Sequence, residues 1–343
     1  MCAAASLPGL ARPAGAAPEI RFASPRFFNT VDPYWSAPYA IAAAQAPFVI
    51  ERQRARLLAP GAWVVVEPDT FLYDTSFWGH RSLAEARRWH QIFRRKKPRP
   101  LRRLEGRVLS LASDFAPHSY GHWLIDSLPR WLIAERAGLR AADFDMIYLP
   151  CPDTPSTRTL LAALGLPSGK LVRTPFTEDL EVGQLTATAF PGAAGGASAL
   201  AREMAVRLQP PRAPRRRLYL ARDGHRRNFR NAAAIDAVLA EFGLEKCLPA
   251  SDADTVSKCA EARIIFGIEG SQCFNALFAP AGGALVVVAP EGFHPLPYMQ
   301  TIAGASGLKL FVIGARRVGP DAMCELEPDS LRAALRAVIE QCP

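Results

Sequence analysis

A histidine and an aspartate in segment 113–130, SDFAPHSYGHWLIDSLPR, have residue types and a spacing suited to proton transfer. His122 and Asp126 are four residues apart, so on a helix they lie on one face and can form a hydrogen bond. A carboxylate that orients a neighbouring imidazole makes a general-base pair, which can take a proton from a hydroxyl nucleophile. A structural alternative stays open, because the same pair can brace the first turn of a helix.

Basic residues follow the predicted strand 218–221 within segment 215–231, RRRLYLARDGHRRNFRN. The rigid fork of an arginine suits phosphate oxygens, and open α/β sheets bind ligands at the carboxyl ends of their strands. Arg222 and Arg227 are therefore candidate ligands of an anion, with a solvated basic turn as the alternative. The loop presents Arg222, His225, Arg226, Arg227 and Arg230.

Glycines at the end of a buried strand in segment 264–283, IIFGIEGSQCFNALFAPAGG, predict a close approach of backbone to a ligand. Gly270 and Ser271 stand at the start of a predicted helix, where unbonded N–H groups and the helix dipole favour an anion. Glu269 ends the strand and can accept hydrogen bonds from sugar or ribose hydroxyls. An ordinary tight strand-to-helix turn would use the same glycines.

Neither a metal nor a dinucleotide cofactor is expected. The DxD pairs Asp143/Asp145 and Asp252/Asp254 lack a convincing context for a divalent cation, and the second pair precedes a predicted helix, where aspartates are favoured anyway. The run GAAGGA at 192–197 does not fit the GxGxxG dinucleotide fingerprint with its acidic residue further along the chain.

The candidate residues of the three segments lie where a strand ends in a loop and a helix begins. The hydropathy pattern predicts such strands and helices. In the first half we expect strands at 63–67, 107–112, 146–149 and 184–190 and helices at 83–95, 121–137 and 156–164. From Leu218 onward, strands alternate regularly with helices, which predicts βαβ units and a parallel sheet covered on both faces. The strands expected there are 218–221, 245–248, 264–267, 284–289 and 309–313, and the helices are 232–242, 254–260, 271–278, 296–305 and 328–341.

Length and composition predict two α/β lobes. A chain of 343 residues, 49% apolar and 21% charged, is long enough for two cores. Prolines in PPRAPRRR, at 210–217, predict a stiff connector. We divide the chain into a loose N-terminal arm 1–30, an N-terminal lobe 31–190, a linker region 191–216 and a C-terminal lobe 217–343, with a cleft where the lobes meet.

The net charge of +9 is concentrated in segment 87–103, RRWHQIFRRKKPRPLRR, which has no acidic residue. Outside it, 32 basic residues face 32 acidic ones, so nothing else indicates binding to a nucleic acid. Leu83, Ala86, Trp89 or His90, and Phe93 recur at helical spacing, which predicts an amphipathic helix able to lie on an anionic membrane. The alternative is a helix packed by this stripe onto the N-terminal lobe.

A cytoplasmic location is expected. No uncharged apolar run reaches the ~18 residues of a spanning helix. The start, MCAAASLPGLARPAG, lacks a basic region and is broken by prolines, unlike a secretory signal. Seven scattered cysteines without a CxxC pair are typical of reduced thiols.

Taken together, the three segments resemble the family 61 glycosyltransferases, found in bacteria as capsular-polysaccharide-biosynthesis-like proteins. The family motifs read approximately GHWLxDxLPR, a strand ending in YxxR, and GxHGxxxxNxLF. They stand here as GHWLIDSLPR at 121–130, YLAR at 219–222, and GIEG through NALF at 267–278. Their order and spacing match over roughly residues 105–315.

The resemblance implies a GT-B architecture, with two Rossmann-like lobes that face a central cleft. It implies inverting transfer without an obligatory metal, from a nucleotide sugar, expected to be UDP-linked, to a glycan or lipid-linked acceptor in surface polysaccharide synthesis. The N-terminal lobe would then be the acceptor side and the C-terminal lobe the donor side. Asp126 is the preferred base, with His122 as its partner or substitute. Donor binding falls to Arg222, Arg227, Glu269, Gly270, Ser271 and Asn275.

One departure from the family concerns Glu269, which replaces the usual histidine of GxHG. A carboxylate would repel phosphate, so Glu269 is expected to face sugar or ribose hydroxyls unless the donor differs. Loss of activity is a further alternative. The rival interpretation is therefore a non-catalytic glycan- or nucleotide-binding protein that keeps the GT-B fold.

Overall fold

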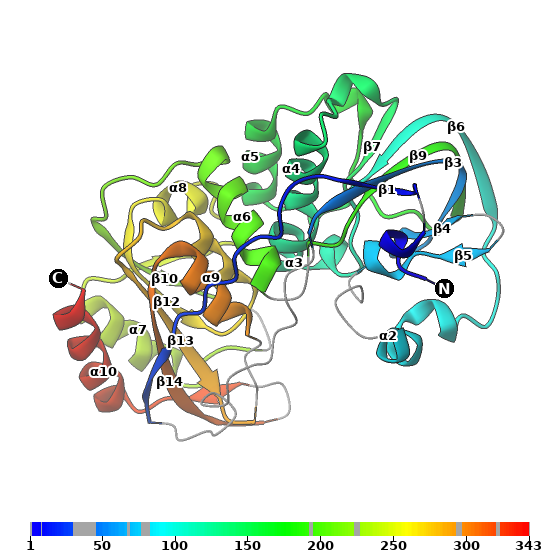
Figure 1. Cartoon of the computed structure of the whole chain (residues 1–343). Coiled ribbons are helices and arrows are strands. Elements are labelled where there is room, and N and C mark those ends of the chain that lie inside the picture. The colour runs from blue at the N-terminus through cyan, green and yellow to red at the C-terminus, as the bar shows by residue number, and fades with distance from the viewer. Residues whose placement is uncertain are drawn as a thin grey trace. The chain divides into compact units, whose positions relative to one another are not determined.

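The computed structural model describes residues 2–7, 9–29, 46–66, 69–76, 83–191, 195–222, 227–292, 297–319 and 323–342. The chain forms two compact units (Figure 1). The N-terminal unit comprises Met1–Glu19, Ala42–Pro152 and Leu161–Met204, and the C-terminal unit comprises Ile20–Ile41, Asp153–Leu160 and Ala205–Pro343. Segment 191–216, expected to be a linker, contains helix α6 (Gly195–Leu208), within which the chain passes from one unit to the other.

The sheet of the N-terminal unit is mixed. Its strand order is β5-β4-β3-β9-β6-β7-β8, and β1 also pairs with β3. Strands β9, β6, β7 and β8 are parallel neighbours, whereas every pairing made by β3, and that of β4 with β5, is antiparallel within the described residues. The strands are β1 (Ala11–Pro13), β3 (Phe48–Leu58), β4 (Trp63–Val66), β5 (Thr70–Phe71), β6 (Leu101–Ser110), β7 (Met146–Tyr148), β8 (Leu171–Val172) and β9 (Asp179–Thr188).

The sequence pattern does not predict strand β3. Its four central residues, ERQR at 51–54, are all exposed, and Arg54 has a positive φ of 50°. No alternation with a period of two therefore marks this strand. Pairing with β9 along one edge and with β1 and β4 along the other makes it a strand.

The helices expected in the first half are present with different ends. They are α2 (Leu83–Trp89), α3 (Tyr120–His122), α4 (Leu128–Arg136) and α5 (Pro155–Leu164). The helix expected at 83–95 ends early, because His90 has an extended backbone and its Nδ1 accepts a hydrogen bond from Ile92 N at 3.2 Å. A separate 3₁₀ turn, Gln91–Arg94, follows, so the prediction of one continuous amphipathic helix is wrong. Among the helices in the described ranges, none has the length and hydropathy needed to cross a bilayer.

The C-terminal unit is built around a parallel sheet, as predicted. Its strand order is β11-β10-β12-β13-β14-β15, with β2 beside β14, and in the described residues only the β14–β15 pairing is antiparallel. The central strand β13 is buried at every residue, which is typical of a strand covered on both faces. The strands are β2 (Pro25–Phe28), β10 (Arg216–Leu220), β11 (Glu245–Cys247), β12 (Ala262–Ile268), β13 (Ala284–Pro290), β14 (Lys309–Arg317) and β15 (Cys324–Glu325).

Helices cover this sheet. Helix α7 packs against α10 (Figure 1). Helices α8 and α9 both pack against the 3₁₀ helix Ser271–Phe278. Apolar residues of α7 and α10 share one core with side chains of β12, β13 and β14. The helices are α7 (Ala232–Glu241), α8 (Thr255–Cys259), α9 (Tyr298–Ser306) and α10 (Pro328–Gln341).

The expectation of a loose arm at 1–30 is wrong. Strand β1 pairs with β3 in the N-terminal unit, and β2 pairs with β14 in the C-terminal unit. Both are short strands added to sheets whose other members lie far along the chain. Backbone hydrogen bonds to β3 and β14 hold these two strands in place. The Ala- and Pro-rich sequence therefore needs no apolar alternation of its own and shows none.

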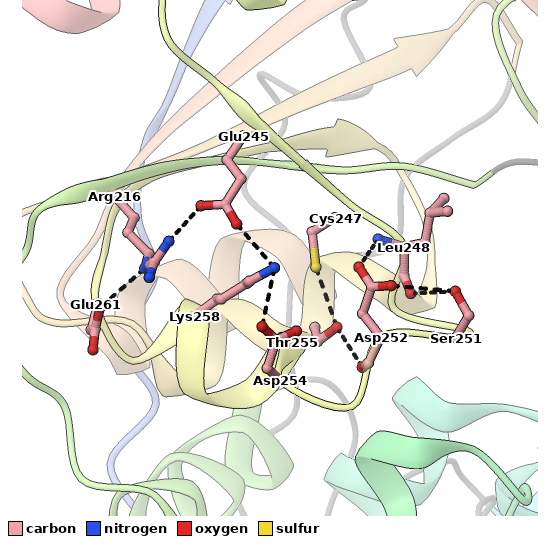
Figure 2. A network of polar contacts seen from close by, with 10 residues as sticks. All are labelled: Arg216, Glu245, Cys247, Leu248, Ser251, Asp252, Asp254, Thr255, Lys258 and Glu261. Carbon is pink, nitrogen blue, oxygen red and sulfur yellow. Dashed lines mark hydrogen bonds and ion pairs between the residues drawn. The ribbon is translucent and has the colours of Figure 1, made fainter.

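Ion pairs gather at the amino ends of three neighbouring strands of the C-terminal sheet (Figure 2). Arg216, which begins β10, pairs with Glu245 at 2.6 Å and with Glu261 at 3.0 Å. Lys258 joins Glu245 at 2.9 Å and Asp254 at 3.2 Å. These contacts tie β10, β11 and α8 together at the end of the sheet opposite to the strand ends that lead into the candidate site.

Candidate functional site

The structure brings His122 and Asp126 together, as their spacing predicts. Strand β6 leads into a loop in which Ser119 caps the next helix, its Oγ accepting a hydrogen bond from His122 N at 3.4 Å. The Nδ1 atom of His122 lies 2.7 Å from Oδ2 of Asp126. Ser113, three residues beyond β6, also donates to this oxygen, with Oγ at 3.4 Å.

Burial distinguishes the two members of this pair. Asp126 is 1% exposed, whereas the His122 side chain is 20% exposed. If Nδ1 donates its proton to the carboxylate, Nε2 becomes the basic nitrogen of the imidazole. The exposed fractions therefore favour His122 as the group that meets a substrate hydroxyl and Asp126 as the group that orients it. This reverses the order of preference taken from the sequence.

The surroundings of His122 raise its pKa above the ordinary 6.5. Burial alone lowers this pKa, because it penalises the charged imidazolium. The hydrogen-bonded Asp126 carboxylate, with a smaller contribution from Asp114, stabilises the imidazolium and outweighs burial. An imidazole with a raised pKa takes up a proton more readily than an isolated histidine.

A π-helical turn, Trp123–Ser127, separates α3 from α4 and contains Asp126. Such turns often occur at functional sites, where they re-aim side chains. Arg130, which lies in α4 four residues after Asp126, stabilises this π-helical turn. Its Nε donates to the Asp126 carbonyl at 3.0 Å, and its Nη2 donates to the Thr75 carbonyl at 2.8 Å. Its guanidinium carbon also lies 5.6 Å from the centre of the Phe190 ring.

Sequence reasoning assigned no role to Arg130 or Ser113, although both lie in segment 113–130. A signal was present, because Arg130 follows Asp126 by four residues and shares its helix face. Its burial could not be read from the sequence. That burial lowers the pKa of Arg130 to about 10, against the opposing effect of Asp126, so the guanidinium stays charged at neutral pH.

The arginines and the acid predicted in the C-terminal unit also lie together. Strands β10 and β12 are parallel neighbours, so Arg222 and Glu269 follow them at the same edge of the sheet. The Nη1 atom of Arg227 donates to the Glu269 carbonyl at 2.6 Å and forms an ion pair with Oε2 of Glu269. Nη1 of Arg222 lies 3.5 Å from the same carbonyl. This geometry gives the carboxylate an arginine partner rather than leaving it to hydroxyls.

Gly270 allows the arginine to lie against the backbone. Its φ of 154° is rarely adopted by other residues, and a Cβ at this position would overlap the guanidinium of Arg222. The following helix is 3₁₀ in type, Ser271–Phe278, where the sequence predicts a helix without specifying its kind. Ser271, at its start, is partly exposed.

Asn275, expected to bind the donor, lies inside the fold. It is fully buried, and its Nδ2 donates to the Gln272 carbonyl at 3.0 Å. This contact braces the 3₁₀ helix. His225 and Arg226, the other basic residues expected in the loop after β10, lie outside the described residues.

Charge and burial act against each other around Glu269. Burial raises the pKa of the Glu269 carboxyl, while Arg227 and then Arg222 oppose the rise. Burial, followed by the neighbouring Arg227, lowers the pKa of Arg222. Counted over the described residues alone, the cluster contains two guanidinium groups and one carboxylate.

The carboxylates of the two DxD pairs bond to the fold. The contacts are Asp143 with Arg140 N at 2.8 Å, Asp145 with Arg107 N at 2.8 Å, Asp252 with Leu248 N at 2.7 Å, and Asp254 with Lys258 at 3.2 Å. Within the part of the chain that the structure describes, no three His, Cys, Asp or Glu side chains come together as metal ligands would.

The family model described as Glycosyltransferase 61 matches residues 120–287. Over these residues, just under half of the chain, the protein is similar to the family 61 glycosyltransferases. The match includes His122, Asp126 and Arg130 of the first cluster and Arg222, Arg227 and Glu269 of the second, whereas Thr75, Ser113, Asp114 and Ser119 precede it. A comparison with curated proteins finds no match for this glycosyltransferase.

Proposed function

We propose that this glycosyltransferase moves a sugar, with inversion, from a nucleotide-sugar donor to a hydroxyl group of a glycan or glycolipid. The donor is UDP-linked, the protein has the GT-B arrangement, and no metal is required. The observation that carries the proposal is the hydrogen-bonded pair of His122 and the buried Asp126. Such a pair supplies the base that a hydroxyl nucleophile needs.

The reaction is a single displacement. Nε2 of His122 accepts the proton of the acceptor hydroxyl, and the resulting imidazolium is stabilised by Asp126. The acceptor oxygen forms a bond to the anomeric carbon while the bond from that carbon to the diphosphate oxygen breaks. The nucleoside diphosphate leaves with the bonding electron pair, and one displacement inverts the anomeric centre.

Charge on the leaving group needs a positive partner. Without a metal, the guanidinium groups of Arg222 and Arg227 and the start of the 3₁₀ helix at Gly270 and Ser271 supply it. We assign the nucleotide-sugar site to the C-terminal unit for this reason, and the acceptor site to the N-terminal unit, which holds the base.

Release of nucleoside diphosphate tests this function and its rival. The full chain, incubated with UDP-sugars and glycan acceptors, should release UDP only when a suitable acceptor is present, and the rate should survive EDTA. A donor that raises the melting temperature but gives no turnover with any acceptor would favour the non-catalytic binding protein; ligand at 100 times its Kd adds about 2.7 kcal/mol of stability. Loss of activity in EDTA that manganese or magnesium restores would contradict the metal-independent mechanism.

A membrane location is part of the proposal. Phe93 and Leu101 are each 50% exposed, and the exposed Lys96 and Lys97 lie between them in the chain. Arg95, in contrast, pairs with the nearly buried Asp179 at 2.8 Å. Two apolar side chains that flank cations suit the boundary of an anionic bilayer. We therefore propose that the protein works in surface polysaccharide synthesis at the cytoplasmic face of the membrane.

Vesicle sedimentation should show this docking. At low salt the protein should bind vesicles with phosphatidylglycerol and ignore vesicles of phosphatidylcholine alone. Changing Lys96 and Lys97 to Glu should weaken binding, since each basic residue near an anionic surface contributes ~1 kcal/mol. Phe93→Ser should weaken it too, whereas Phe22→Ser, at a 45% exposed position outside the segment, is the matched control. Equal binding by all variants would contradict a role for this segment.

A further inference from the structure

The ion pair between Arg227 and Glu269 places an anion inside the cluster assigned to the donor diphosphate. Glu269 is 5% exposed and meets Arg227 through both its carboxylate and its carbonyl oxygen. Charge-assisted contacts of this kind are about twice as strong as hydrogen bonds between neutral groups. A diphosphate that approaches Arg227 must therefore compete with a carboxylate that is already bound.

Arg222 differs from Arg227 in its partners. Its Nη1 donates to the Glu269 carbonyl at 3.5 Å, a long hydrogen bond to a neutral group. Its guanidinium lies over Gly270, where any larger residue would displace it. Among the described residues, Arg222 makes no ion pair within 4.0 Å, in contrast to Arg227.

We infer that Glu269 is a built-in counter-ion of the anion site: it holds Arg227 when no ligand is bound and sets a low affinity for free diphosphate. The inference rests on the proposed function, because it takes the cluster to be the donor site. It makes Glu269 a residue that determines specificity. Displacing its carboxylate costs binding free energy, and only a ligand whose nucleoside or sugar also contacts the protein compensates for that cost. It also favours release of the product diphosphate.

The opposite expectation follows if Glu269 binds ligand hydroxyls directly. In that case its removal weakens the binding of a nucleotide sugar. If Glu269 instead competes with phosphate oxygens, its removal strengthens the binding of any diphosphate. The sign of one change in affinity therefore separates the two roles.

Calorimetric titration of the full chain with inorganic pyrophosphate and with UDP, at fixed salt, makes this test. Glu269→Gln keeps the shape of the side chain and its capacity to accept a hydrogen bond from Arg227 while removing the charge. We expect the affinity for both ligands to rise at least about tenfold, equivalent to about 1.4 kcal/mol. The double variant Glu269→Gln/Arg227→Gln should lose that gain, because the released guanidinium is its source.

The matched control is Glu261→Gln. Glu261 is also nearly buried and pairs with arginines, but it precedes β12, whereas Glu269 follows it (Figure 2 shows Glu261 beside Arg216). It should leave pyrophosphate affinity unchanged, and circular dichroism checks the fold of each variant.

Three results would overturn the inference. If the wild type binds UDP and Glu269→Gln binds it equally or more weakly, Glu269 is no competitor, and the proposed donor site still stands. If the gain persists in the double variant, Arg227 is not its source. If neither the wild type nor Glu269→Gln binds pyrophosphate or UDP, the donor site itself is wrong, and the inference falls with it.

Discussion

Replacing His122 by alanine should lower turnover by about 10²-fold or more, which is the usual contribution of a general base. The imidazole is the more exposed member of the pair, and its Nδ1 is already directed at Asp126. Nucleotide affinity should stay at the wild-type value, because the residues assigned to the donor belong to the C-terminal unit. Initial rates at saturating donor and calorimetry with UDP measure the two quantities separately.

The variant Asp126→Asn distinguishes the two candidate bases through the pH profile. If His122 is the base, the rate falls and the acid limb of the profile moves to lower pH. The reason is that the carboxylate raises the pKa of His122, while burial, which lowers it, remains in the variant. If Asp126 is the base, its substitution removes this limb, whereas His122→Ala keeps an acid limb.

His118→Ala is the control for both variants. His118 ends the preceding 3₁₀ turn and is exposed, so its loss should leave rate and pH profile unchanged. Circular dichroism must accompany the kinetics. A loss of folded signal in Asp126→Asn would show that the pair mainly braces the helix, and a His122→Ala variant with full activity would exclude the imidazole from the chemistry.

Replacing Arg222 by alanine should weaken the binding of UDP by about 1.5–3 kcal/mol, the range for hydrogen bonds to charged groups. Arg222 follows β10 directly beside Gly270. Among the described residues it has no carboxylate within ion-pair distance, in contrast to Arg227. Turnover at subsaturating donor should fall in proportion, and calorimetry gives the change in affinity.

Arg230→Ala is the matched control, since Arg230 is an exposed arginine of the same loop region. It should bind UDP as the wild type does. An unchanged affinity in Arg222→Ala would remove Arg222 from the site, and equal losses in both variants would mean that general positive charge rather than a specific contact attracts the nucleotide. In either case the donor site proposed at the carboxyl ends of β10 and β12 would have to be abandoned.

The regular half of the fold could be predicted because its signal is local. From Leu218 onward, short continuous apolar runs mark the buried strands, and they alternate with helices whose apolar residues recur with a period of 3.6. The structure confirms these elements with small shifts at their ends, such as β12 at Ala262–Ile268 for the strand expected at 264–267.

The first half was harder to predict, because its strands depend on distant partners. The exposed middle of β3 carries no alternation, and β1 and β2 are short edge strands in a segment expected to be a loose arm. The helix expected at 83–95 is divided at His90, whose side chain packs against Trp63 and Phe71. Contacts of this kind override local propensity.

The sequence by itself determined the reactive groups, their spacing along one helix, and the two strand ends that lead into the anion cluster. Only the tertiary structure decided that Asp126 is buried beneath His122, that Arg130 holds its backbone, and that Glu269 pairs with Arg227, 42 residues before it. The physical reason is that burial and ion pairing depend on which strands become neighbours. Which strands become neighbours depends on the packing of the whole sheet, and this packing produces no periodic hydropathy pattern in the sequence.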